Sequence, residues 1–203
     1  MKARAVCVAA ALLLFAVTAQ AGEDRSSCTP EPQSGGGWQV GTGMEVDVSM
    51  IEAMTAASIL KVGPYDKVGE TMDELLQWVQ DKGVEVTGPA FGVYYDNPET
   101  TPPESTRFEF GVPVPEGTGG DDEAGVQVKT WGSRLAAKAL FTGPYDQVGP
   151  TYGALGQWIQ QNGYRMAGPT IEVYLNDPNQ VPPESLQTRV CFIVEKSEPS
   201  AEQ

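Results

Sequence analysis

The sequence contains no histidine, and this absence excludes several kinds of active site. Histidine is the commonest general base near neutral pH and the commonest side-chain ligand of metals such as zinc. Hydrolases built on a serine–histidine or cysteine–histidine pair are therefore excluded. Any catalysis would depend on carboxylates, tyrosines or a lone cysteine, and the sequence predicts no metal site and no cofactor.

Basic residues are also scarce. The chain has 13 lysines and arginines against 27 acidic residues, and its formal net charge is −14. A charge of this sign repels phosphate backbones, so we expect no binding to nucleic acid. It would attract cationic small molecules, although it is equally typical of the soluble surface of a secreted protein.

No hydrophobic run is long enough to cross a membrane. The longest, from Val6 to Val17, has about 12 residues, whereas a spanning helix needs about 20. Lys2 and Arg4 precede this run, and Ala19-Gln20-Ala21 follows it as a small-x-small cleavage site. This pattern predicts a signal peptide over residues 1–21, cleaved after Ala21, and a periplasmic or secreted protein without a membrane span.

Cysteine is rare as well, and cleavage would leave only Cys28 and Cys191. In an oxidising compartment these two could form one disulfide, which would attach the N-terminal arm to the body of the protein. Lipidation of Cys28 is an alternative. The residues before it, Arg25-Ser26-Ser27, lack the aliphatic residue that a lipidation signal carries.

The sequence does contain an internal repeat. Residues 46–114 align with residues 126–194 at a constant offset of 80, without a gap, and 27 of the 69 aligned pairs are identical. Gly63-Pro64-Tyr65-Asp66, for example, returns as Gly143-Pro144-Tyr145-Asp146. Two copies are too few for a solenoid. We expect two units packed about a pseudo-twofold axis, with a ligand pocket at their seam.

Three polar segments border the units. They are a flexible lead over residues 22–45, an acidic glycine-rich linker over residues 115–125, and a tail over residues 195–203.

Within each unit the pattern predicts strand, strand, helix, strand, strand. In the first unit an apolar stripe with helical spacing comprises Val68, Met72, Leu75, Leu76 and Val79. Alternating apolar residues before and after it indicate strands. The prediction is an α+β fold with about eight antiparallel strands and two main helices. One helix cannot cover a four-stranded sheet, so the units should depend on each other.

Glu172 is the most informative single residue. It lies in the otherwise apolar segment 169–174, and its counterpart in the first unit is Gly92, so the fold itself does not require a charge here. A buried carboxylate could recognise a cationic ligand or act in acid–base chemistry. The alternative is a Glu172 that faces solvent on the outside of the sheet.

Aromatic residues occur in pairs at equivalent positions and are candidates for the walls of a pocket. They are Tyr65 and Tyr145, Tyr94 and Tyr174, and Trp78 and Trp158. The alternative for each pair is ordinary packing, and the tryptophans lie at the flank of the apolar helical stripe.

These motifs together resemble the GyrI-like, or AraC effector-binding, small-molecule-binding domain. The resemblance covers residues 46–194 and includes the double Gly-Pro-Tyr, the tryptophan-bearing helix and the Pro-Glu-Ser before the last strand. It implies two strand–helix–strand–strand units that hold a ligand between them. In such sensors a glutamate in a Pro-x-x-Glu-x-Tyr motif contacts lipophilic cations, and this motif matches Pro169, Glu172 and Tyr174. Arg107 matches a further family arginine, whereas the second unit has Gln187 there.

The leading hypothesis is an exported binding protein that holds a small organic molecule, partly apolar and in the family typically a lipophilic cation. Its predicted contacts are Glu172 and the six paired aromatic residues. One alternative is a hydrolase with Glu172 as its acid or base, because some stand-alone relatives hydrolyse reactive cyclopropane compounds. Another is an interaction module of the cell envelope with an exposed apolar patch. Export would separate the chain from DNA and from gyrase, the partners of other family members.

Overall fold

The computed structural model describes residues 38–39 and 44–197. The predicted signal peptide, Cys28 and most of the predicted lead lie outside the described residues, as does the tail from residue 198. The pairing of Cys28 with Cys191 therefore stays a prediction. Within the lead, Trp38–Gln39 forms a short strand, and the last strand extends to Lys196, inside the predicted tail.

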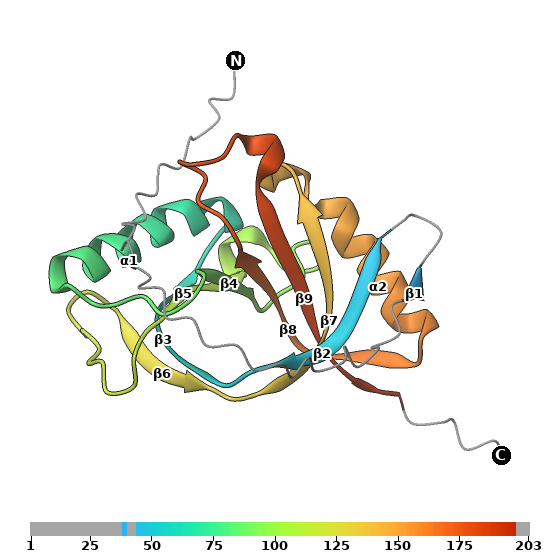
Figure 1. Ribbon diagram of the computed structural model, residues 1–203, viewed down its shortest axis with the longest axis horizontal. Helices are drawn as coiled ribbons and strands as arrows, with labels where there is room; N and C mark the ends of the chain where they lie inside the picture. The colour runs from blue at the N-terminus through green and yellow to red at the C-terminus, as the bar shows by residue number, and fades with distance from the viewer. Residues whose placement is uncertain (1–37, 40–43, 198–203) are drawn as a thin grey trace, which may run out of the picture.

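Within the described residues, one antiparallel sheet of nine strands packs with two α-helices, which confirms the α+β class (Figure 1). The first strand, β1, has only two residues. In chain order the strands are β1 (Trp38–Gln39), β2 (Glu45–Ile51), β3 (Met54–Val62), β4 (Phe91–Tyr94), β5 (Arg107–Pro113), β6 (Gln127–Trp131), β7 (Arg134–Thr142), β8 (Tyr164–Tyr174) and β9 (Gln187–Lys196). The helices are α1 (Val68–Lys82) and α2 (Gly149–Gln161).

Helix α1 follows the predicted apolar stripe from its first residue, Val68. It ends before Gly83, whose φ of 63° is in the left-handed region that glycine adopts without strain. A 3-10 turn precedes each helix, η1 (Tyr65–Lys67) before α1 and η3 (Tyr145–Gln147) before α2. Each Gly-Pro-Tyr motif thus carries its tyrosine to the N-terminal end of a helix.

The strand order is β1-β2-β7-β9-β8-β4-β5-β3-β6. From β2 inward the order is β2-β7-β9-β8, and from β6 inward it is β6-β3-β5-β4. Strands at the same place in these two series occupy equivalent positions in the two repeats, 80 residues apart. The first strand of each unit pairs with the other unit: β2 with β7, and β6 with β3. The two units therefore depend on each other, as expected, while the pseudo-twofold axis stays a prediction.

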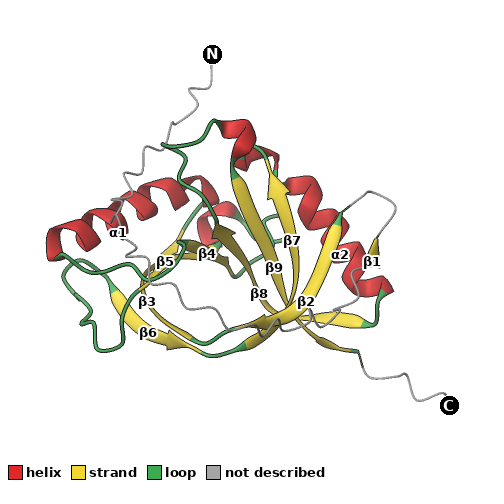
Figure 2. Cartoon of the chain, viewed as in Figure 1, coloured by secondary structure: helices red, strands yellow, loops and turns green. Residues whose placement is uncertain are grey.

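Each helix covers one half of the sheet, and α1 and α2 lie at opposite ends of it (Figures 1 and 2). Helix α1 packs on β3 and β5, and α2 packs on β7, β8 and β9. Leu75 of α1 and Leu155 of α2 are each completely buried in the resulting cores. The central strand pair, β4 and β8, lies between these two cores.

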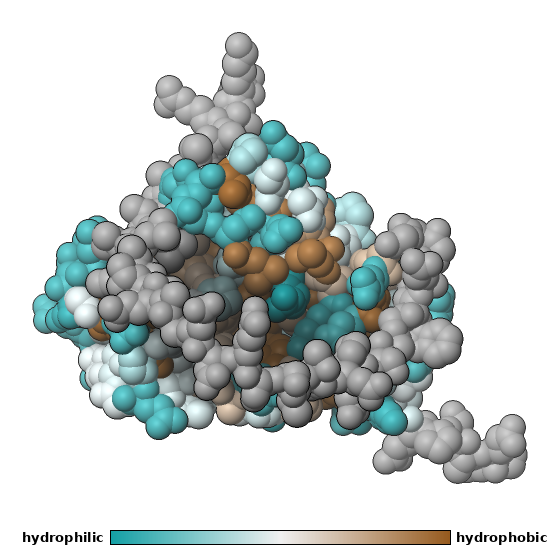
Figure 3. Space-filling view, viewed as in Figure 1, coloured by the Kyte–Doolittle hydropathy of each residue, from teal (hydrophilic) through white to brown (hydrophobic). Residues whose placement is uncertain are grey.

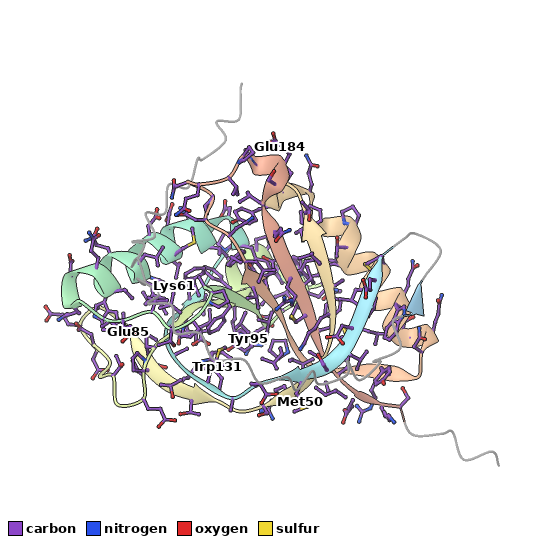
Figure 4. The ribbon with its side chains drawn as sticks, viewed as in Figure 1. Met50, Lys61, Glu85, Tyr95, Trp131 and Glu184 are labelled. Carbon is purple, nitrogen blue, oxygen red and sulfur yellow. The ribbon has the colours of Figure 1, made fainter. Side chains whose placement is uncertain are left out.

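Alternate residues of the same strands face the other side of the sheet and form a third apolar cluster. Its buried members are Ala56, Phe91, Val93, Ala136, Ile171, Cys191 and Ile193. The face turned to the viewer in Figure 3 is hollowed at its centre, and hydrophobic side chains are visible in the hollow. Tyr95 and Trp131, which pack against this cluster, lie between the central strands and the band formed by β2, β3 and β6 (Figure 4).

The predicted linker between the units is attached to α1. The carboxylate of Asp121 accepts a hydrogen bond from Trp78 Nε1 at 3.1 Å and lies 2.9 Å from Lys82 Nζ. Lys82, the backbone N–H of Ala124 and Trp78 together lower the pKa of Asp121 to about 2. Asp121 therefore fastens the linker to the helix that carries Trp78.

Candidate ligand-binding site

Glu172 lies at the centre of the sheet, on β8, where it is directly opposite Gly92 of β4. Because side chains alternate along a strand, Glu172 and Tyr174 share a face, while Ile171 belongs to the cluster on the other face. The side of Glu172 is the side of the helices, since Tyr152 of α2 contacts it. Glu172 is 8% exposed, which excludes the alternative of a solvent-facing residue.

Three tyrosine hydroxyls donate hydrogen bonds to the Glu172 carboxylate. Tyr152 donates to Oε1 at 2.6 Å, and Tyr174 and Tyr94 donate to Oε2 at 3.0 and 3.2 Å. A carboxylate offers about four lone-pair sites, so one acceptor position is left for another donor. Burial is the largest cause that raises the pKa of all three phenols, and the charge of Glu172 raises it further. The phenols therefore remain protonated donors.

Gly92 provides the space in which two of these hydroxyls meet. The hydroxyls of Tyr94 and Tyr174 lie 3.0 Å apart. A Cβ atom on Gly92 would come within 3.0 Å of the Tyr174 hydroxyl and 3.1 Å of the Tyr94 hydroxyl. The missing side chain in the first unit is thus what allows two tyrosines to reach the carboxylate of the second.

Further aromatic rings border this cluster. The Tyr65 ring meets Tyr94 edge-on at 5.1 Å between centroids, and the Tyr145 ring meets Tyr174 edge-on at 5.5 Å. Phe110 stacks on Tyr174 at 6.0 Å. These rings therefore pack around the tyrosines that hold the Glu172 carboxylate.

Among the described residues, no lysine or arginine forms an ion pair with Glu172. The other buried glutamate, Glu109, serves as a comparison. It accepts hydrogen bonds from Ser58 Oγ and from the Tyr95 hydroxyl, and Lys129 Nζ lies 2.6 Å from it. Glu109 thus forms an ion pair with Lys129, whereas Glu172 has no cationic partner among the described residues.

The structure brings five of the seven predicted site residues together. Glu172, Tyr94 and Tyr174 form the centre, and Tyr65 and Tyr145 border it.

Trp78 and Trp158 lie instead in the two helix–sheet cores, where they are 7% and 3% exposed. Trp78 is held by Asp121 and Trp158 stacks on Tyr164, so the site described here does not include them.

Tyr152 is the site residue that the sequence pattern did not reveal. It packs against the apolar core under α2, as its helical spacing predicts, yet its hydroxyl makes the shortest hydrogen bond to Glu172. The signal that could have found it is the comparison of repeats. Tyr152 replaces Met72, just as Glu172 replaces Gly92, and in both cases the second unit gains a polar group.

Comparison with known proteins shows the family of the chain. The model of the GyrI-like small molecule binding domain matches residues 44–195.

The chain belongs to the GyrI-like family.

Among its relatives, the DNA gyrase inhibitor of Escherichia coli (strain K12) is 33% identical over 139 residues, covering 66% of this chain and 87% of the relative. That of Escherichia fergusonii is 31% identical over 138 residues, covering 66% and 88%.

Among solved structures, the C-terminal domain of EcmrR superimposes with a TM-score of 0.67 at 21% identity, covering 75% of this chain and 98% of that domain. A hydrolase from Listeria innocua gives a TM-score of 0.53 at 14% identity, covering 74% and 91%. These two likenesses show a shared fold.

Two further findings concern metal ions and membranes. Within residues 44–197 and β1, no group of three or more Cys, Asp or Glu residues could hold a metal ion. None of the helices in this part of the chain is long and apolar enough to cross a membrane.

Proposed function

We propose that this GyrI-like protein is exported and binds a partly apolar, cationic small molecule, with Glu172 as the charge partner. The observation that carries the proposal is the buried Glu172 carboxylate, which three phenols hold and no cation of the described residues neutralises. Membership of a small-molecule-binding family supports a small organic ligand.

The energetics favour a cation at this position. Removing a carboxylate from water costs several kcal/mol, and hydrogen bonds from neutral phenols offset only part of that cost. A bound cation would neutralise Glu172, as Lys129 neutralises Glu109. Each favourable contact between the cation and the face of a tyrosine ring would add about 0.5–2 kcal/mol.

The export part of the proposal rests on residues 1–21. The charged start, the short apolar run and Ala19-Gln20-Ala21 support cleavage after Ala21. An exported chain would not meet gyrase, the target named for the E. coli relative. The N-terminal sequence of the protein recovered from a periplasmic extract or culture medium tests this. It should begin at Gly22.

Ligand binding is best tested with two ions of equal shape and opposite charge. Tetraphenylphosphonium and tetraphenylborate are each added to the mature protein, and the unfolding temperature is measured. A ligand at 100 times its dissociation constant stabilises a protein by about 2.7 kcal/mol. We expect a shift with the cation only, and its loss in Glu172→Gln.

The Glu172→Gln variant should itself fold. Glutamine has nearly the same size as glutamate, and the substitution removes a buried charge that has no cationic partner among the described residues. Equal shifts with both ions, or a cation shift that survives in Glu172→Gln, would refute a charge role for this residue. No shift with either ion would favour the hydrolase or the interaction module.

A further inference from the structure

The two tyrosines that border Glu172 are equivalent in sequence but are held differently. In the first unit the Tyr65 hydroxyl donates to the carbonyl oxygen of Asp96 at 2.6 Å. The Asp96 carboxylate in turn accepts two hydrogen bonds from the Arg107 guanidinium, both at 2.9 Å. Tyr65 is therefore anchored to a loop that an ion pair keeps in place.

In the second unit Asn176 and Gln187 replace Asp96 and Arg107, so the ion pair is lost. The Asn176 side chain keeps the hydrogen bond from the backbone N–H of residue 187 and donates another to the carbonyl oxygen of Ser185. The Tyr145 hydroxyl makes no hydrogen bond to any other described residue, and Tyr145 is 37% exposed. Its ring can change rotamer without breaking a hydrogen bond.

The charges beside the two tyrosines differ in the same direction. Arg107 neutralises Asp96 in the first unit. In the second unit the Asp177 carboxylate accepts hydrogen bonds, as far as the described residues are concerned, only from neutral groups of Asn179 and Gln180. Burial raises the pKa of Tyr145, and the charges of Asp177 and Glu172 raise it further, so both carboxylates act on this one ring.

We propose that the cation reaches Glu172 from the side of the second unit, past Asp177, and that Tyr145 is the ring that moves to admit it. This inference rests on the proposed binding of a cation by Glu172. Asp177 raises the local concentration of cations by electrostatic attraction, Tyr145 offers the first aromatic face, and Glu172 completes the binding. The side of Tyr65 stays closed.

The repeat supplies a matched pair of variants for the test. Asn97 is the counterpart of Asp177, and each side chain oxygen accepts a bond from a backbone N–H two residues later, at 2.9 Å for Asn97 and 2.8 Å for Asp177. Asp177→Asn and Asn97→Asp therefore exchange a charge and keep the turn. The double variant has the net charge of the natural protein but carries the carboxylate beside Tyr65.

The association rate constant is measured by stopped-flow with ethidium, a lipophilic cation that fluoresces when it leaves water. At low ionic strength, Asp177→Asn and the double variant should each associate about threefold more slowly, and salt should remove the difference. Asn97→Asp alone should associate at the natural rate. Tyr145→Ala should associate faster, because the moving ring is gone, and dissociate faster, because an aromatic contact is lost.

Two kinds of failure are distinguishable. If ethidium does not bind the natural protein, or binds Glu172→Gln equally well, the proposed function itself fails. If binding requires Glu172 but the double variant associates at the natural rate, the cation does not enter past Asp177. An unchanged association rate in Tyr145→Ala would show that this ring does not limit entry.

Discussion

Glu172 and Gly92 face each other across the central strand pair, and they occupy the same position in the two repeats. A carboxylate at both positions would place two like charges at the centre of the sheet, which is costly in a buried site. At these two positions the protein has one carboxylate, that of Glu172, and no side chain at Gly92. The hydroxyls of Tyr94 and Tyr174 occupy the space that a side chain at Gly92 would need.

Gly92→Ala should weaken cation binding without unfolding the protein. The added methyl group would displace the hydroxyls of Tyr94 and Tyr174, which lie within 3.1 Å of its position. We expect tetraphenylphosphonium to bind about threefold to tenfold more weakly, which is the loss of roughly one hydrogen bond. Isothermal titration calorimetry measures this. Gly132→Ala, at a position with nothing within 4 Å, is the control and should bind normally.

Tyr152→Phe should destabilise the free protein more than the bound one. It removes the hydroxyl that lies 2.6 Å from Glu172, so the buried charge loses a donor, at a cost of about 1–3 kcal/mol. Because the carboxylate then needs a cation more, the stabilisation by tetraphenylphosphonium should be at least as large as in the natural protein. Calorimetric unfolding with and without the ion tests this. Tyr164→Phe serves as the comparison and should leave both values nearly unchanged, since Tyr164 stacks on Trp158 in the α2 core.

Lys129→Met should lower stability and leave ligand binding intact. It removes the cation of the buried Glu109, and because Lys129 is 40% exposed the loss should be about 1–2 kcal/mol. Urea unfolding measures the free energy, and the dissociation constant of tetraphenylphosphonium should not change. A parallel loss of binding would contradict the separate roles assigned to the two buried glutamates.

Acid should unfold the protein partly through Asp121. The pKa of this group is lowered from 3.8 to about 2 in the folded protein. Between these values the unfolded chain binds more protons, so stability falls as the pH falls through this range and is fully present above it. The unfolding temperature of Asp121→Asn should therefore depend less steeply on pH between 4 and 2. Equal slopes in Asp121→Asn and the natural protein would show that the contacts of Asp121 contribute nothing to stability.

The sequence was sufficient for much of the fold because the repeat shows each pattern twice. The stripe from Val68 to Val79 lies within α1, which begins at Val68 and ends just before Gly83. The exchange of β2 and β6 between units could not be predicted. An alternation of Val46 and Val48 shows that a strand has one buried face, but it does not show which distant strand will pair with it.

The site was predictable to the extent that it follows strand alternation. Glu172 and Tyr174 are two residues apart on β8 and therefore share a face. Tyr152 was not predicted, because its helical spacing is the same as that of the core residues beside it. Only the fold reveals that this turn of α2 lies above the centre of the sheet. Trp78 and Trp158 show the reverse, because paired aromatics at repeat positions are equally compatible with a core.

The exchange of first strands has one more consequence. A single unit made alone would lack the strand that its partner supplies, and it could complete its sheet only by taking that strand from a second copy. Such a homodimer would carry the same residue on both central strands, either two glutamates or two glycines. When both units belong to one polypeptide, their sequences can differ. One unit can then supply the carboxylate, and the other can supply the glycine that leaves space beside it.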